Sequence, residues 1–146
     1  MAVNLSRKTL GIVGLGKLGA AVARVGVLAW GMKVVCWNKN LTQVGADGVA
    51  RDVSVLVETE ADGGSMEKTF KVVSKEELFK MSDVVSLHHV LSERSRGMVG
   101  SRELGIMKKL AFSINVWRGP LVDEKALLET LQGGKIRGAA LDMSHV

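Results

Sequence analysis

Short, largely apolar runs alternate along the chain with segments in which apolar residues recur every three or four positions. The runs are short and rich in β-branched residues, which predicts strands that are buried on both faces. These expected strands cover residues 10–13, 33–37, 70–73, 83–87, 110–115 and 138–143. Segments with helical spacing are expected at 17–30, from residue 74 onward, at 101–107 and at 123–131.

The first expected helix, residues 17–30, carries apolar residues at helical spacing, and we expect these residues to face the sheet. They are Leu18, Val22, Val25 and Ala29. Gly31 is expected to end this helix, because glycine readily adopts the left-handed conformation that follows a helix.

Polar residues mark the starts of the later helices. Ser74 is an expected N-cap, and Glu77, three residues further on, completes a capping box. Ser101 is expected to cap the next helix, with Glu103 in its first turn. Asp123 is expected to cap the last helix.

Residues 42–71 show the least regular pattern in the chain. A helix is usual at this place, but several β-branched residues and four glycines argue against a long one. The glycines are Gly45, Gly48, Gly63 and Gly64. Alternating valines, at positions 53, 55 and 57, are typical of a short exposed strand. We therefore expect an irregular segment here.

Six strands that alternate with helices predict an α/β fold, with one parallel sheet between two helical layers. This is the doubly wound, or Rossmann, architecture. A length of 146 residues predicts a single domain, residues 1–146. The hydrophobic fraction of 47% and the charged fraction of 24% are typical of a globular chain rather than a disordered one.

Composition bears on the compartment and the partners. The one cysteine, Cys36, excludes an internal disulfide framework and fits a reducing compartment. With no signal peptide and no run of eighteen apolar residues, we expect a cytoplasmic protein without a membrane span. The net charge of +5 suits a phosphate-bearing ligand. Nucleic acid is not the expected partner, because the basic residues are scattered and aromatic residues for base stacking are few.

A glycine turn, Gly14-x-Gly16-x-x-Gly19, connects the first expected strand to the first expected helix. Gly14 allows a sharp turn, Gly16 allows the backbone to approach a pyrophosphate, and Gly19 allows the helix to pack close to the strand. The free N–H groups at the helix N-terminus favour an anion. This strand–turn–helix pattern predicts dinucleotide binding.

The end of the second expected strand bears on which dinucleotide binds. An NAD site usually has a carboxylate there for the ribose 2′-hydroxyl, whereas this chain has Asn38, followed by Lys39. A 2′-phosphate would be tolerated, so NADP is at least as plausible as NAD. A simple turn with a solvated lysine remains the alternative interpretation.

Two adjacent histidines, His88 and His89, follow the fourth expected strand at the carboxyl end of the sheet, where such folds bind ligands. His88 is a candidate for lining a cofactor pocket. Neighbouring residues of a strand point to opposite faces, so we do not expect the pair to chelate one metal ion.

Four stretches together resemble the NAD-binding domain of the D-isomer-specific 2-hydroxyacid dehydrogenases: Leu10–Gly19, Lys75–Leu87, Asn115–Leu131 and Lys135–Asp142. The run RGPLVDE is quite specific. The resemblance covers nearly the whole chain apart from residues 42–71. It implies binding of NAD or NADP, a homodimer formed through this domain, and hydride transfer between the nicotinamide and a 2-hydroxy or 2-oxo acid.

The resemblance also implies roles for individual residues. Arg118 would hold the carboxylate and carbonyl of the 2-oxo acid, for which a planar guanidinium is well suited. Asp142 matches the aspartate near the nicotinamide carboxamide. Lys17 and Leu18, with the glycines, match the turn that holds the pyrophosphate.

The sequence departs from the family pattern beside Arg118. Val116 and Trp117 stand where the family usually has a threonine and a small residue. The Trp117 ring would fill the nicotinamide pocket, stack on the nicotinamide or cover another surface. All three possibilities stay open.

Two catalytic residues of the family, a glutamate and an acid–base histidine, match nothing in this sequence. The chain ends at Val146, about where the glutamate would follow, and His145 does not match the histidine. The second, substrate-binding domain is expected to be absent as well. Two functions are therefore considered. The first is a cofactor domain of, or derived from, a dehydrogenase, inactive by itself, and the second is a repurposed module that binds another ligand or a protein partner.

Overall fold

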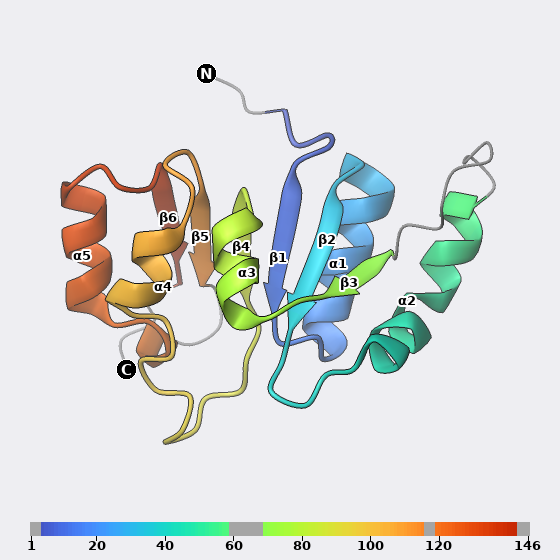
Figure 1. Ribbon diagram of the computed structural model, residues 1–146, viewed down its shortest axis with the longest axis horizontal. Coiled ribbons are helices and arrows are strands. Elements are labelled where there is room, and N and C mark those ends of the chain that lie inside the picture. Colours follow the sequence, from blue (N-terminus) through green and yellow to red (C-terminus); the bar gives the residue numbers. More distant parts are fainter. Residues whose placement is uncertain (1–3, 59–68, 116–118, 143–146) are drawn as a thin grey trace.

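Six parallel strands form one sheet at the centre of the structure, a computed structural model that describes residues 4–58, 69–115 and 119–142 (Figure 1). The strand order is β3-β2-β1-β4-β5-β6. The strands are β1 (Thr9–Val13), β2 (Lys33–Trp37), β3 (Phe70–Val72), β4 (Val84–Leu87), β5 (Phe112–Asn115) and β6 (Gly138–Leu141).

The helices cover the sheet in two layers. In Figure 1, α1 and α2 lie on one face, while α3, α4 and α5 lie on the other. The helices are α1 (Lys17–Trp30), α2 (Gln43–Glu58), α3 (Lys75–Met81), α4 (Ser101–Ile106) and α5 (Glu124–Gln132), with a 3-10 turn η1 (Gly119–Leu121). The predicted doubly wound α/β fold is confirmed. Among the described residues, no helix has both the length and the apolarity that crossing a membrane requires.

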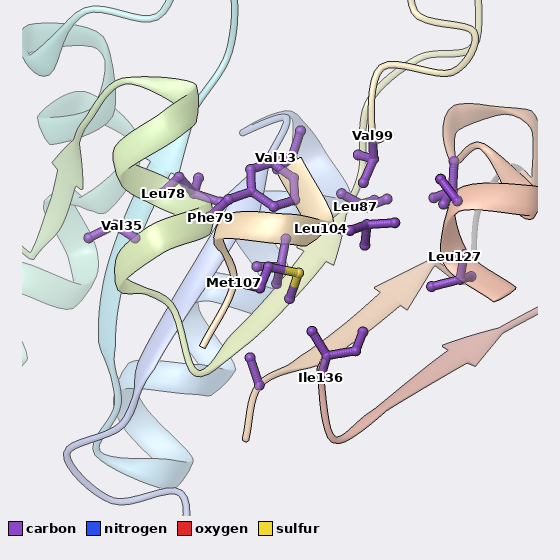
Figure 2. Packing of buried hydrophobic residues seen from close by; sticks show 14 residues of the cluster. Val13, Val35, Leu78, Phe79, Leu87, Val99, Leu104, Met107, Leu127 and Ile136 are labelled. Carbon is purple, nitrogen blue, oxygen red and sulfur yellow. The ribbon is translucent and has the colours of Figure 1, made fainter. Parts of the chain in front are cut away.

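Successive residues of each strand point into two different cores, as the period of a strand requires. Ile12 and Cys36 face the layer of α1 and α2, whereas Val13 and Val35 face the layer of α3, α4 and α5. Figure 2 shows the second core, in which the Phe79 side chain of α3 is fully buried. We call these two sides of the sheet the α1–α2 face and the α3–α5 face.

All six predicted strands are present, with boundaries that differ by up to two residues. β1 begins at Thr9, one residue earlier than predicted, and β5 begins at Phe112 rather than at Leu110. The Leu110 side chain is 69% exposed, which fits a position before the buried strand. β6 ends at Leu141 and was predicted to reach residue 143, which lies outside the described residues.

The prediction of an irregular segment at 42–71 is wrong for its first part, because Gln43–Glu58 is helix α2. Ala46 and Ala50, one helical turn apart, are both buried against the α1–α2 core. Gly48 lies on the exposed side, where its cost relative to alanine is about 1 kcal/mol. Burial of the alanine face offsets this cost, so packing overrides the weak helix propensity. Residues 59–68 lie outside the described residues.

The side chain of Gln43 joins α2 to the edge strand β3. Its Nε2 donates to the Phe70 carbonyl at 2.7 Å, and its Oε1 accepts from the Val72 N–H at 2.9 Å. The carboxamide thus continues the hydrogen-bond ladder beyond the last strand, as the peptide of a further strand would.

The bounds of α1 were predicted correctly, and Gly31 ends it with φ of +60°, as expected. The predicted buried face is wrong: Leu18 and Val25 are about half exposed, at 49% and 54%. Ala29 is also exposed and Val22 only partly buried. The buried residues are the small ones, Gly19, Ala20, Ala23 and Gly26. Small residues bring the helix close to the sheet, since a Cβ on Gly26 would lie 2.7 Å from Leu10 Cδ2.

Two of the three predicted helix caps are confirmed. The Ser74 Oγ accepts from the Glu77 N–H at 3.1 Å, and the Ser74 N–H donates to Glu77 Oε2 at 2.9 Å, which completes the capping box. The Asp123 carboxylate accepts from the Ala126 N–H at 3.1 Å at the start of α5.

The prediction that Ser101 caps α4 is wrong. Gly100 is the N-cap, and Ser101 is the first helical residue. Glu103 explains the shift, because its Oε2 accepts from the Gly100 N–H at 2.9 Å and satisfies the group that precedes the helix.

Candidate functional site

The strand register places the carboxyl ends of the central strands side by side. Val13 pairs with Trp37 on one side and with Leu87 on the other. The residues that follow these three strand ends, Gly14, Asn38 and His88, therefore form one row along the edge of the sheet. This edge includes the point between β1 and β4 where the strand order reverses, which is where doubly wound folds bind ligands.

The glycine turn is held tightly against β4. Gly14 has φ of +95°, a conformation that favours glycine, and a Cβ there would lie 2.7 Å from the His88 carbonyl oxygen. A Cβ on Gly19 would clash with the carbonyl oxygen of Gly14. The predicted roles of these two glycines, a sharp turn and close helix packing, are confirmed by these contacts.

Gly16 has a different environment. It is the N-cap of α1, and a Cβ on it would meet no protein atom within 4 Å. No side chain of the described residues caps the helix here, and the first turn carries no acidic residue. The N-terminal N–H groups of α1, beside the exposed Lys17 and Leu18, thus remain available to an anion. The turn fits a pyrophosphate, because no protein atom lies within 4 Å of the position that a Cβ on Gly16 would take.

The end of β2 carries no carboxylate. Asn38 is partly buried, and its Oδ1 accepts from the Lys39 N–H at 2.9 Å, while the Lys39 side chain is exposed. The Lys39 cation and the neutral Asn38 side chain therefore lie where the 2′-hydroxyl or 2′-phosphate of a bound dinucleotide would be placed.

His88 faces the α1–α2 side and hydrogen-bonds within its own strand. Its Nε2 lies 2.8 Å from the Oγ of the buried Ser86. Burial lowers the pKa of His88 below its ordinary value of 6.5. The ring is therefore neutral at pH 7, beside the turn that Gly14 forms.

An aromatic and charged cluster on the α3–α5 side of this edge was not identified from the sequence. The rings of Trp37 and His89 stack with centroids 6.3 Å apart and an interplanar angle of 25°. Lys75 Nζ lies 5.9 Å from the Trp37 ring centroid and 3.1 Å from Glu103 Oε1. Burial and the Lys75 charge lower the pKa of His89. The signal available in the sequence was strand alternation, which turns Trp37 away from Cys36 and onto this side.

The other side of the edge is only partly described. The Asp142 N–H donates to the carbonyl of the buried Asn115 at 3.1 Å, so the exposed Asp142 joins the row at the end of β6. Val116, Trp117 and Arg118, which the sequence placed here, lie outside the described residues. The structure thus brings together the glycine turn, Asn38, His88 and Asp142 along one edge.

This combination of fold and turn defines a dinucleotide-binding α/β domain. The family model described as "D-isomer specific 2-hydroxyacid dehydrogenase, NAD binding domain" matches residues 1–145, so the chain belongs to this family and corresponds to its NAD-binding domain. The expected family is confirmed, and the comparisons give no support to a repurposed module.

Individual relatives agree with this assignment. A glyoxylate reductase from Aeropyrum pernix is 34% identical over 98% of this chain and 37% of its own length. A D-lactate dehydrogenase with NAD+ from Lactobacillus jensenii has a TM-score of 0.78 and 29% identity, over 99% of this chain and 38% of that one. An acyclic imino acid reductase in complex with NADPH and D-Arg has a TM-score of 0.76 and 30% identity. The match covers 100% of this chain and 40% of that one. The chain thus spans less than half the length of these relatives.

Proposed function

We propose that the chain binds a nicotinamide dinucleotide across the carboxyl edge of its sheet, with the pyrophosphate on the turn from Gly14 to Gly19. The observation that carries this proposal is the uncapped N-terminus of α1, with open space above Gly16. Lys17 and Leu18 begin the helix at that point. The bound nicotinamide would supply or accept the hydride.

The cofactor preference rests on the end of β2. We propose that the site accepts NADP as well as NAD, because a carboxylate that would repel a 2′-phosphate is missing at Asn38 and the Lys39 cation stands beside it. The relative that holds NADPH has the same fold, which supports this proposal.

At the nicotinamide end, we propose the roles that the family resemblance implies. Arg118 would bind the carboxylate of a 2-oxo acid, and Asp142 would lie near the carboxamide. Val116 and Trp117 would form the wall beside the nicotinamide. No residue matches the family's acid–base histidine or its glutamate, so we propose that the 146-residue chain alone binds cofactor without transferring hydride.

Two further properties are proposed on the same basis. The chain is proposed to form a homodimer, as the family resemblance implies. It is proposed to act in the cytoplasm, because its one cysteine, Cys36, is a buried free thiol, which fits a reducing compartment.

Calorimetric titration of the chain with NADPH and with NADH tests the site and its preference together. We expect both dinucleotides to bind. In the Asn38→Asp variant, the added carboxylate repels a 2′-phosphate and accepts from a 2′-hydroxyl, so NADPH affinity should fall about tenfold or more relative to NADH. Lys125→Gln, at an exposed position of α5, makes the same change in net charge and should leave the preference unaltered. No heat with either dinucleotide would refute the proposed function.

A further inference from the structure

Ser86 of β4 is a buried serine that hydrogen-bonds to the ring of His88. It is 4% exposed, and its Oγ lies 2.8 Å from Nε2 of His88, two residues further along the chain. On the neighbouring strands its register partners are Ile12 and Ile114, whose side chains offer no acceptor. In the part of the chain that the structure describes, the Ser86 hydroxyl has no other hydrogen-bond partner, so its proton depends on His88 for an acceptor.

The direction of this hydrogen bond follows from what each group can offer. A hydroxyl both donates and accepts, whereas a neutral imidazole has one donor nitrogen and one acceptor nitrogen. If Nε2 of His88 carried the proton, the buried hydroxyl proton of Ser86 would have no acceptor among the described residues, which is costly. The Ser86 O–H therefore donates to Nε2. The ring proton then resides on Nδ1, because the bond made by one ring nitrogen sets the tautomer.

The Nδ1 end of the ring is the end that can reach a ligand. The two nitrogens of an imidazole point in widely different directions, so Nδ1 points away from Ser86. Since Ser86 precedes His88 on the strand, Nδ1 lies toward the carboxyl edge of the sheet. His88 is only partly buried, and within the described ranges its Nδ1 has no hydrogen-bond partner. The ring thus presents an N–H donor at this edge.

His88 lies directly beside the glycine turn. Its backbone N–H donates to the Val13 carbonyl at 2.7 Å, and a Cβ on Gly14 would lie 2.7 Å from its carbonyl oxygen. Its ring shares the α1–α2 face with Ser86, the register partner of Ile12. This is the face on which α1 begins. A donor next to a pyrophosphate turn is suited to the oxygen acceptors that phosphates and riboses carry.

We propose that Ser86 is a positioning residue of the dinucleotide site, which holds His88 in the Nδ1–H tautomer so that the ring donates to an oxygen of the bound dinucleotide. This inference rests on the proposed function, because the acceptor belongs to the dinucleotide. Ser86 acts through His88, since its own side chain is buried. Burial also lowers the pKa of His88, so at pH 7 the ring keeps an acceptor nitrogen for Ser86.

Proton–nitrogen correlation spectra of the chain without ligand, at about pH 8, show which ring nitrogen carries the proton. The chain has three histidines, and the signals of His88 are those that His88→Gln removes. We expect the proton on Nδ1. Neutral histidine in water prefers the proton on Nε2, so Ser86→Ala should shift the ring toward Nε2–H. Ser86→Thr keeps the hydroxyl and should keep the Nδ1–H tautomer.

The matched control is Ser113→Ala. Ser113 is 1% exposed on the neighbouring strand β5, and its register partner Val85 belongs to the core on the α3–α5 face. The control therefore removes an equally buried hydroxyl from the other side of the sheet. It should leave the tautomer of His88 unchanged.

Calorimetric titration of the same variants with NADPH connects the tautomer to the ligand. Ser86→Ala should weaken NADPH binding about three- to tenfold, the effect of one hydrogen bond, and Ser113→Ala should not. Two substitutions of His88 leave the buried serine in place. Asparagine carries its amide nitrogen at the position of Nδ1, and glutamine carries its amide nitrogen at the position of Nε2. His88→Gln should therefore weaken binding more than His88→Asn. Urea unfolding shows which variants are folded, and only folded ones are compared.

Three results would overturn the proposal. They are a proton on Nε2 in the unsubstituted chain, a Ser86→Ala variant that binds NADPH as tightly as the unsubstituted chain, and a His88→Gln variant that binds NADPH at least as tightly as His88→Asn. Failure of the proposed function is distinguished from these results. No heat with NADPH from the unsubstituted chain refutes dinucleotide binding and the donation to it, whereas the spectra without ligand still decide the role of Ser86 in setting the tautomer.

Discussion

The three glycines of the turn meet three different constraints at the scale of single residues. Gly14 adopts a positive φ, Gly19 touches the backbone of the turn, and Gly16 faces open space. The spacing predicted these roles because each follows from the strand–turn–helix path. The stacking of Trp37 on His89 could not be predicted in this way, since it depends on loop conformation after two different strands.

Two glycine-to-alanine substitutions distinguish the effect of a close backbone contact on the free energy of unfolding from the effect of helix propensity. Gly19→Ala should lower the free energy of unfolding by about 1–3 kcal/mol or more, because the new methyl group meets the Gly14 carbonyl oxygen. Gly48→Ala, in α2, meets no atom within 4 Å and should raise it by about 0.5–1 kcal/mol. Urea unfolding without cofactor measures both, and changes of the same sign would contradict the packing described for α1.

At the scale of elements, the sequence predicted where α1 begins and ends but not which face it buries. Periodicity located the large apolar residues, whereas close packing required the small ones, Gly19, Ala20, Ala23 and Gly26. The search for large apolar residues also missed α2, in which the buried side chains of the described positions 43–51 are Ala46 and Ala50. Helical spacing of small residues was the signal that both predictions overlooked.

The Gln43 carboxamide should determine how firmly β3 is held. Gln43→Ala leaves the Val72 N–H and the Phe70 carbonyl without this partner, so the free energy of unfolding should fall by about 1–2 kcal/mol. Hydrogen exchange at the Val72 amide should accelerate at the same time. Gln132→Ala, at the exposed end of α5, serves as the control and should change neither quantity. Unchanged exchange at Val72 would contradict the role of Gln43.

At the scale of the whole molecule, pH should act on stability through the two histidines at the carboxyl edge. The pKa values of His88 and His89 are lowered in the folded chain, so the unfolded chain binds more protons near pH 6. Stability is therefore complete above about pH 6.5 and falls as the pH decreases toward the folded pKa values. Hydrogen bonds to Ser74 lower the pKa of the Glu77 carboxyl, so this group reduces the stability of the fold only below about pH 4.5.

Urea unfolding from about pH 8 to about pH 5 measures this dependence. The chain should lose stability toward the acid end, and a variant with both His88→Gln and His89→Gln should show a flatter profile. The control is His145→Gln, a substitution in the C-terminal segment that leaves both His88 and His89 in place. A profile that keeps its slope in the double variant would show that other groups cause the acid sensitivity.

The parallel sheet and the position of the site could be predicted from the sequence, because strands that alternate with helices pair in parallel. Carboxyl ends of parallel strands share one edge, so residues after separate apolar runs, such as Gly14 and His88, had to become neighbours. The position of α2 beside α1, with Ala46 and Ala50 in the α1–α2 core, could not be predicted, because the sequence was expected to form an irregular segment at 42–71.

The central claim is that the N-terminus of α1 binds the pyrophosphate of a nicotinamide dinucleotide, and Gly16→Ser tests it most directly. Serine caps a helix better than glycine, so its Oγ should occupy the free N–H groups and raise the free energy of unfolding by a few tenths of a kcal/mol. The same Cβ and Oγ should weaken NADPH binding about tenfold or more in a calorimetric titration. A more stable variant that binds NADPH as tightly as the unsubstituted chain would contradict the claim.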